Sequence, residues 1–330
     1  MGTRGVWSLG NVESKYPLED WVNYKDPWLP QYDIAHSRPF PAPNLQRWNL
    51  GTSTMSNSTL SCSRYWGQAA GNTTVTYFAS GDESPGMTKK SNTDKLTYSP
   101  YTIAATPTAN LNKGIDRGGT SSSNLAAYFS TGYPTGSWVD KILFATDTRS
   151  TISGQFDTNY MTFSSVSDGA GGGYLFEANV SQSKTYKITY STDGVSHLPG
   201  SNLVNYTTES NGEMMSRTAG YKTGGANPSP AATTTTNKLT YSSMTWSALP
   251  SGGLPIAKRR LASGTGRSKG FAGGGDLNVA PVYTDFALLD FSTDTFAQEP
   301  SLNFSVSNYG YFTNKSTTTP LDGLYGATKA

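Results

Sequence analysis

The chain has little of the chemistry that usually marks a metalloenzyme or a disulfide-stabilised protein. Its 330 residues include one cysteine, Cys62, and two histidines, His36 and His197. A single cysteine excludes an intrachain disulfide framework and a cysteine-based zinc site, so the fold must depend on packing. No apolar run approaches the roughly 20 residues that span a bilayer, so we expect no membrane insertion. The N-terminus lacks the apolar segment of a signal peptide, and we expect synthesis in a cytoplasm.

Charge is also scarce and evenly mixed. Only 15% of residues are charged, and 25 basic residues nearly balance 23 acidic ones, for a formal net charge of +2. Because the two signs are interspersed, no long-range field favours nucleic acid or an anionic membrane. The one compact basic cluster is Lys258, Arg259 and Arg260. We predict that it forms a solvated turn or pairs with a local carboxylate.

Aromatic residues, by contrast, are abundant. The chain has 7 Trp, 20 Tyr and 13 Phe, although only 35% of its residues are hydrophobic. Large aromatic rings let a mostly polar chain bury enough surface to fold, which argues against disorder. Abundant Gly, Ser, Thr and Asn favour many short strands joined by tight turns. The composition therefore predicts an all-β protein.

A short aromatic element recurs six times along the chain. Each copy carries a tyrosine or phenylalanine close to small residues or a pair of glycines. The copies are residues 76–81, 127–132, 173–175, 220–225, 270–274 and 310–312. Successive copies start 40 to 51 residues apart, close to the period of about 50 residues of kelch-type propeller blades. Because small residues suit converging backbones with φ > 0, we expect this strand to lie near a central channel.

A second element follows each copy at a similar distance. It has the pattern lysine, aliphatic, any residue, aromatic, and the period of two is that of a β-strand. Its copies are residues 94–99, 140–144, 186–191 and 237–242, with a looser fifth copy at 287–292. We expect one face of this strand to pack between blades. A weaker third strand is predicted at residues 111–117, 160–165, 203–208, 256–261 and 302–306, with hairpin tips at 82–92 and 226–236.

The two ends of the repeat region predict how the ring closes. Residues 44–50 fit the second strand of a blade and residues 60–65 the third, but no first strand precedes them. The unpaired first strand is at 310–312, so the first blade combines residues 44–75 with residues 309–315. Residues 44–330 are therefore predicted to form a six-bladed propeller. Joining both chain ends in one blade hides strand edges that an open array would expose.

The repeats resemble those of a known group of proteins. The units at 220–225 with 237–242, and at 127–148, resemble the kelch-like propeller repeats of tail and appendage proteins from bacteriophages of marine bacteria and cyanobacteria. The resemblance covers about residues 44–315. It implies a six-bladed, kelch-like β-propeller in a virion structural or appendage protein, such as a tail fibre or a tail- or head-associated component.

Residues 1–43 are predicted to be an extended docking arm. They lack the blade pattern, hold three of the seven tryptophans, and contain the extended run Pro39-Phe40-Pro41-Ala42-Pro43. The start of the arm resembles the short leader that precedes repeats in phage structural proteins, which implies docking on another virion protein. The predicted docking residues are Val6, Trp7, Leu9, Trp21 and Trp28. The alternative is that the arm folds back onto its own propeller.

We predict no catalytic, cofactor-binding or metal-binding residue, and therefore not an enzyme. Copper radical oxidases with a kelch fold need two histidines and a cysteine near tyrosines, but here His36 lies in the arm and His197 in a blade loop. The recurring aspartates are expected to form turns by bonding their own backbone: Asp94, Asp140, Asp147, Asp193 and Asp294. The glycine runs at 171–173 and 273–275 lack the strand-to-helix context of phosphate loops.

Two binding functions remain as alternatives. Exposed Tyr and Trp beside Asn, Asp and Ser would form a saccharide platform, as in a receptor- or carbohydrate-binding propeller that attaches to a host glycan or receptor. Packing between blades explains the same tyrosines equally well. The third hypothesis is a secreted or cell-surface lectin-like module of bacterial origin.

Overall fold

The computed structural model describes most of the repeat region and short parts of both chain ends. The described residues are 32–36, 44–49, 54–62, 67–72, 74–83, 88–98, 100–115, 118–130, 132, 138–152, 156, 163–169, 171–177, 184–204, 212–226, 231–249, 251–259, 261–265, 269–277, 283–303, 309–313 and 325–329. Within them the protein is an all-β propeller, and the one helical segment is the 3-10 turn Pro107–Ala109.

Five blades of four antiparallel strands each follow one another along the chain. Blade A contains β4 (Gln68–Gly71), β5 (Val75–Ala79), β8 (Thr93–Thr97) and β9 (Thr102–Ala105). Blade B contains β10 (Thr120–Ser122), β11 (Ala126–Ser130), β12 (Val139–Leu143) and β13 (Thr148–Ile152). Blade C contains β14 (Phe163–Ser167), β15 (Gly172–Glu177), β16 (Thr185–Thr189) and β17 (Gly194–His197).

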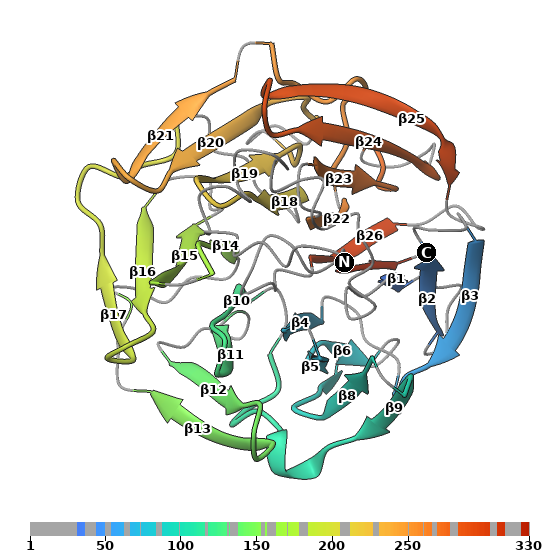
Figure 1. Cartoon of the computed structure of the whole chain (residues 1–330), viewed down its shortest axis with the longest axis vertical. Coiled ribbons are helices and arrows are strands. Elements are labelled where there is room, and N and C mark those ends of the chain that lie inside the picture. Colours follow the sequence, from blue (N-terminus) through green and yellow to red (C-terminus); the bar gives the residue numbers. More distant parts are fainter. Residues whose placement is uncertain are drawn as a thin grey trace, which may run out of the picture.

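Blade D contains β18 (Gly212–Met215), β19 (Ala219–Thr223), β20 (Thr236–Thr240) and β21 (Thr245–Ala248). Blade E contains β22 (Ala262–Thr265), β23 (Lys269–Gly273), β24 (Asp285–Asp290) and β25 (Thr295–Asn303). Figure 1 shows the blades arranged in a ring, with β4, β10, β14, β18 and β22 towards the centre and β9, β13, β17, β21 and β25 at the perimeter. A small hairpin, β6 (Asp82–Glu83) with β7 (Thr88–Lys89), extends the loop between the second and third strands of blade A.

Both ends of the chain contribute to the part of the ring between blades E and A. The strands there run in the order β26 (Tyr309–Thr313), β27 (Tyr325–Lys329), β1 (Tyr32–His36), β2 (Asn44–Asn49) and β3 (Thr54–Thr59). The strand β26 pairs with β22 of blade E and contacts β4 of blade A. The N- and C-terminal strands β1 and β27 are parallel neighbours.

The third strand of each blade shows why the repeat folds as it does. In β8, β16 and β20 the first two residues and the aliphatic fourth residue are buried, while the lysine and the threonine are partly buried. The second strands β5, β11 and β19 are buried along their whole length. Strands with both faces buried are typical of a sheet held between two neighbours.

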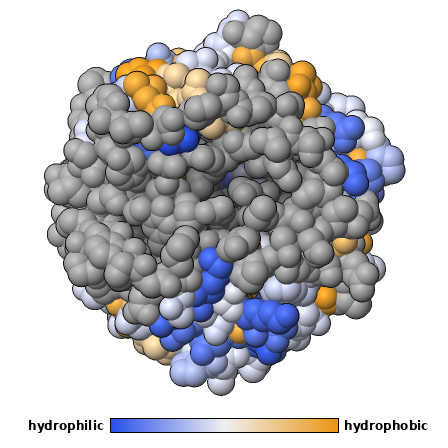
Figure 2. All heavy atoms as spheres, turned by 180° about the vertical axis from the view of Figure 1, so that it is seen from behind, coloured by the Kyte–Doolittle hydropathy of each residue, from blue (hydrophilic) through white to orange (hydrophobic). Residues whose placement is uncertain are grey.

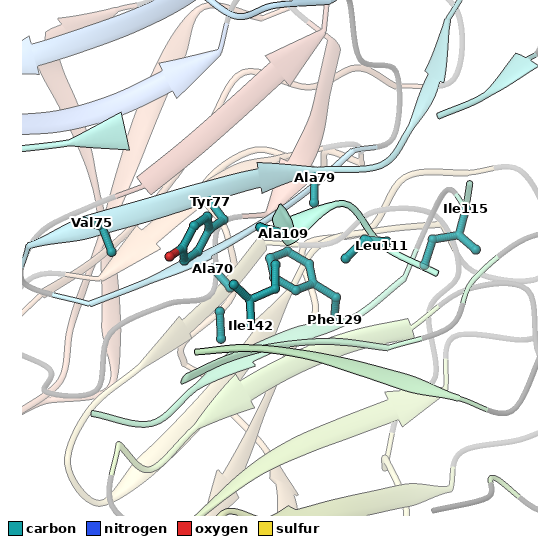
Figure 3. Packing of buried hydrophobic residues seen from close by; sticks show 10 residues of the cluster. Ala70, Val75, Tyr77, Ala79, Ala109, Leu111, Ile115, Phe129 and Ile142 are labelled. Atoms are coloured by element: carbon teal, nitrogen blue, oxygen red, sulfur yellow. The ribbon is translucent and has the colours of Figure 1, made fainter. Parts of the chain in front are cut away.

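The hydrophobic core is divided among the seams between blades. Figure 3 shows the seam between blades A and B, where Tyr77 and Val75 of blade A face Phe129 and Ile142 of blade B. Similar clusters surround Tyr128 with Ile188, and Tyr174 with Leu239. Each blade therefore completes its core only by contact with the next blade.

The structure corrects several strand assignments. The recurring aromatic strand is the second strand of each blade, and another short strand lies inside it. The fourth strands begin at Thr102, Thr148, Gly194, Thr245 and Thr295, whereas the predicted third strand at 111–117 lies in the connection between blades A and B. After β2, the next strand is Thr54–Thr59 rather than residues 60–65.

The structure describes one strand within the predicted arm. The strand β1, which falls inside residues 1–43, pairs with β2 and β27 and so belongs to a sheet. The predicted first-blade strand at 309–315 joins the same sheet as β2, but β27 and β1 lie between them. Residues 1–31 lie outside the described residues.

Figure 2 shows the face opposite to that of Figure 1. Its coloured, described atoms lie mainly around the rim, where small hydrophobic groups alternate with hydrophilic ones. In the described part of the chain, the largest exposed apolar side chain by fraction is Leu125, at 75%. None of the described helical segments has the length and hydropathy to cross a membrane.

Candidate functional site: the seams between blades

A set of three polar side chains recurs at the seams. A tyrosine on the second strand and a lysine on the third strand of one blade lie directly opposite each other: Tyr77 and Lys95, Tyr128 and Lys141, Tyr174 and Lys187, Tyr221 and Lys238. At three of these seams an aspartate reaches them from the turn between the third and fourth strands of the next blade. The repeat thus encodes contacts between blades as well as the strands themselves.

The seam between blades B and C shows the geometry. The Lys141 ammonium donates to both oxygens of Asp193, at 2.9 and 2.7 Å, and the Tyr128 hydroxyl donates to Oδ1 of Asp193 at 3.0 Å. The same ammonium lies 5.7 Å from the centre of the Tyr128 ring. One carboxylate therefore links two strands of the neighbouring blade.

The same arrangement joins blades A to B and D to E. Lys95 donates to Asp147 at 2.7 and 2.8 Å, and the Tyr77 hydroxyl donates to the same carboxylate. Lys238 and the Tyr221 hydroxyl donate to opposite oxygens of a single aspartate, at 2.6 and 2.8 Å. That aspartate is Asp294.

Each of these aspartates occupies a left-handed backbone position. Their φ angles are 55° for Asp147, 54° for Asp193 and 57° for Asp294. Among non-glycine residues, Asp and Asn adopt this conformation most readily. The tight turn therefore favours an aspartate, and the turn aims its carboxylate at the preceding blade.

Aromatic stacking supports the same contacts. The aromatic residue that follows the third strand of one blade stacks on the seam tyrosine of the blade before it. Centroid distances are 4.9 to 5.9 Å and interplanar angles 6 to 22° for Tyr77 with Phe144, Tyr128 with Tyr190, Tyr174 with Tyr241, and Tyr221 with Phe291. Offset stacking of this kind adds about 0.5–1.5 kcal/mol per pair beyond area burial.

Burial in the seams raises the pKa of these tyrosines. Desolvation is the main cause for Tyr77, Tyr128 and Tyr221, and the adjacent aspartate raises the pKa of each phenol further. Tyr190 and Tyr241 also have raised pKa values, again mainly through burial. The phenols therefore stay neutral and donate hydrogen bonds at ordinary pH.

The seam between blades C and D departs from the pattern. The position of the aspartate is taken by Met244, which has a φ of 53°. The Tyr174 hydroxyl instead donates to Asp168 of its own blade at 2.9 Å. Lys187 keeps its place 5.6 Å from the Tyr174 ring, but within the described residues it forms no ion pair.

Two ion pairs join the connection between blades D and E to blade E. Arg259 Nε donates to Asp276 at 2.8 Å, with side chains only 3% and 0% exposed. Lys258 Nζ donates to Asp285 at 2.7 Å and lies 4.8 Å from the Tyr283 ring centre. Backbone bridges pair Arg259 with Asp276, and Lys258 with Thr233.

These pairs shift the pKa values of the groups that form them. Burial lowers the pKa of Lys258, and the Asp285 carboxylate offsets part of that effect. Burial opposes ionisation of Asp285, but hydrogen bonds from Lys258 and Gln298 hold its pKa below the usual range. For Lys258 and Arg259, the predicted carboxylate partners are present, and the two side chains are buried rather than solvated. Arg260 lies outside the described residues.

Hydroxyl groups link the innermost strands across the seams. Thr120 of β10 donates its amide to Ser165 Oγ at 2.7 Å and its hydroxyl to the Ala69 carbonyl at 2.9 Å. On the other side of the ring, Glu213 and Met215 donate their amides to the hydroxyls of Ser263 and Thr265 at 2.8 and 2.9 Å. The innermost strands thus use short polar side chains to satisfy backbone groups of their neighbours.

The predicted turn role of the aspartates is wrong in its detail. Asp94 and Asp140 are the second residues of third strands. They accept hydrogen bonds from the backbone amides of Ser61 and Asn112 at 3.2 and 2.7 Å. Asp147, Asp193 and Asp294 do lie at turns, but their side chains bond across the seams. The repeated lysine in the strand pattern could have indicated these contacts between blades, because a lysine on a half-buried strand needs a hydrogen-bond acceptor.

The other predicted positions are dispersed. His197 lies on β17 with its ring centre 5.5 Å from that of Tyr186, and His36 lies on β1. The described residues contain no group of three metal-ligating side chains. The predicted docking residues Val6, Trp7, Leu9, Trp21 and Trp28 lie outside the described part of the chain.

Comparison with known proteins defines the fold class. No family model matches the sequence, and no curated protein matches it. A solved structure described as "Structure of YjhT" is similar with a TM-score of 0.63 and 10% sequence identity, covering 82% of this chain and 97% of that one. At this identity the likeness shows a kelch-like β-propeller fold and nothing about activity.

Proposed function

We propose that the chain is a non-enzymatic virion structural or appendage protein that displays a propeller and docks through its N-terminal segment. The phage assignment follows from the resemblance of the repeats at 127–148 and 220–242. The observation that best supports docking is the pairing of β1 with both β2 and β27. A segment that carries Trp7, Trp21 and Trp28 leads directly into this strand, so a partner holding the segment would also hold the ring.

In this proposal the propeller has six blades. The sixth consists of β26, β27, β1, β2 and β3, which lie between blades E and A. Contact of β26 with β4, and its pairing with β22, support closure at this point. A blade built from both chain ends resists opening because neither end can leave without breaking strand pairs.

The use of polar side chains also supports a structural role. Three lysines, three aspartates and three tyrosines that could otherwise act as acid–base groups link one blade to the next. Four seam tyrosines that would be candidates for a saccharide platform are at most 1% exposed: Tyr77, Tyr128, Tyr174 and Tyr221. A receptor- or carbohydrate-binding function, the alternative, would have to use other residues.

The first test is to locate the protein in purified phage particles by cryo-EM and cross-linking. We expect the propeller on the tail or head, with cross-links from residues 1–31 to another virion protein. The variant Trp7→Ala is expected to lose incorporation into particles while its thermal unfolding stays as in the wild type. The matched control is Leu125→Ala, which alters an exposed apolar residue of the ring and should leave incorporation unchanged.

Three results would count against the proposal. Absence of the protein from particles would refute the virion assignment. Normal incorporation of Trp7→Ala together with Trp28→Ala would refute docking by this segment. Saturable binding of a saccharide, measured on a glycan array with the whole protein, would favour the alternative.

A further inference from the structure

The seam between blades C and D contains a lysine without the acceptor that its counterparts have. Lys95, Lys141 and Lys238 each bond an aspartate of the next blade at 2.6 to 2.9 Å. Lys187 occupies the same strand position, opposite its seam tyrosine. Its ammonium lies 5.6 Å from the centre of the Tyr174 ring.

Having Met244 at the aspartate position is unfavourable in two ways. A methionine with a φ of 53° is strained, at a cost of order 1 kcal/mol, more than an aspartate would be. Among the described residues, this seam also has no lysine–aspartate hydrogen bond like those that cross three other seams of the same chain. Positions where a repeat breaks its own rule at an energetic cost are expected at functional sites.

An external group can reach this part of a seam. At the three complete seams the aspartate side chains are 30 to 34% exposed and the lysines 18 to 23% exposed. Lys187 and Met244 are themselves partly buried rather than enclosed. The stem of Lys187 lies across Gly172, where an added Cβ would be 2.7 Å from Lys187 Cε. Gly172 therefore leaves room for the lysine along the blade edge.

The chemistry of the seam favours a carboxylate next to an apolar group. The Lys187 ammonium can donate hydrogen bonds to a carboxylate. The Asp168 carboxylate of the same blade accepts from the Gly171 and Gly172 amides at 2.7 and 2.8 Å and from the Tyr174 hydroxyl. Met244 packs against the cluster that contains Tyr174, and methionine side chains adapt to varied apolar partners.

We propose that the seam between blades C and D is a docking site for an aspartate or glutamate side chain of a partner protein. The incoming carboxylate accepts hydrogen bonds from Lys187, and an apolar residue beside it contacts Met244. The partner thereby supplies the group that Asp147, Asp193 and Asp294 supply at the other seams. This site is separate from the N-terminal segment and does not depend on docking through it.

The probe for this site is the capped peptide Glu-Leu-Glu, with Gln-Leu-Gln as its neutral counterpart. In protein labelled with ¹³C at the methionine methyl groups, Glu-Leu-Glu is expected to shift the Met244 resonance in a saturable manner. The shift should weaken as salt is raised, because the contact is ionic and partly exposed. The neutral peptide should give no saturable shift.

Variants then test the residues that carry the site, with binding measured by anisotropy of the labelled peptide. Lys187→Gln is expected to weaken binding about tenfold or more, since it removes a charge-assisted bond. The matched control is Lys141→Gln, whose lysine already has an aspartate, and it should change binding less than about twofold. Met244→Asp should abolish binding while raising thermal stability, because the chain then supplies its own carboxylate.

The gain-of-site variant Asp193→Met should bind a second peptide at the seam between blades B and C. The proposal is overturned if Glu-Leu-Glu gives no saturable shift of the Met244 methyl group, or if Lys187→Gln and Lys141→Gln weaken binding equally. Circular dichroism of each variant confirms that a loss of binding does not come from unfolding.

Discussion

The ion pair between Arg259 and Asp276 is the polar contact whose loss we expect to cost most. Its side chains are 3% and 0% exposed, and Nε lies 2.8 Å from Oδ1. At an effective dielectric constant of about 20 the attraction at this distance is about 6 kcal/mol, which is offset by several kcal/mol of desolvation per ion. The intact pair therefore adds little net stability, but removing one of its two charges would be strongly unfavourable.

A double-mutant cycle tests this reasoning. We expect Asp276→Leu and Arg259→Met each to lower the free energy of unfolding by about 3–5 kcal/mol, because each removes one charge of a buried ion pair and keeps the other. The double variant should be less destabilised than the sum of the two, with an interaction energy of about 2 kcal/mol or more. Urea unfolding followed by tryptophan fluorescence gives the required free energies.

The double-mutant cycle changes the side-chain contact without removing the backbone contact between the same two residues. Arg259 and Asp276 also exchange backbone hydrogen bonds of 3.0 and 3.1 Å, and side-chain substitution leaves these in place. If either single variant costs less than about 1 kcal/mol, or if the costs simply add, the pair is not a buried, coupled unit. The reference is Lys141→Met, since the ion pair of Lys141 with Asp193 is 18% and 34% exposed.

The remaining predictions concern the seams and one loop. Asp193→Ala should lower the free energy of unfolding by about 1–2 kcal/mol, because both Lys141 and Tyr128 lose their acceptor; a urea-induced transition unchanged from the wild type would refute this. The pKa values of Tyr77, Tyr128 and Tyr221 are raised in the folded state, so their stabilising contribution is complete below the unfolded pKa of about 10 and is lost as pH rises above it. Absorbance at 295 nm should therefore show these phenols ionising only with alkaline unfolding, and early titration of all tyrosines would contradict it. Gly275→Ala should lower the free energy of unfolding by about 1–3 kcal/mol, since φ is +87° and an added Cβ would lie 2.5 Å from the Arg259 carbonyl oxygen. The control is Gly200→Ala, because Gly200 has a φ of +83° but open space around an added Cβ. It separates the cost of backbone strain from the cost of the clash.

Much of the fold could be predicted because the second and third strands carry a strong repeat. Their aromatic and aliphatic residues recur since both faces are buried between blades. The innermost strands were missed because segments such as Gln68–Gly71 and Thr120–Ser122 are short and consist mostly of small residues, with no aromatic or large aliphatic side chain to mark a strand. Without these strands, the aromatic strand was predicted to lie one position too close to the channel. The expected positive φ at a glycine pair is confirmed at Gly224 and Gly225.

The seam contacts could not be read from local patterns. Lys95 and Asp147 are 52 residues apart, and Lys238 and Asp294 are 56 apart. An aspartate in a tight turn looks locally like a residue that bonds its own backbone. Only the ring arrangement shows that each such turn faces the lysine of the preceding blade. The buried pair of Arg259 and Asp276 likewise depends on two segments 17 residues apart, on either side of β22 and β23, coming together.

The seams also give the ring a direction. Every complete seam receives tyrosine and lysine from one blade and aspartate with an aromatic residue from the following blade, so the two faces of a blade are complementary rather than alike. Such a contact is the intramolecular counterpart of the head-to-tail interface of a cyclic oligomer. If the chain were cut between blades, each fragment would have one end that presents tyrosine and lysine and another end that presents aspartate and an aromatic residue. The two fragments could therefore associate in only one orientation.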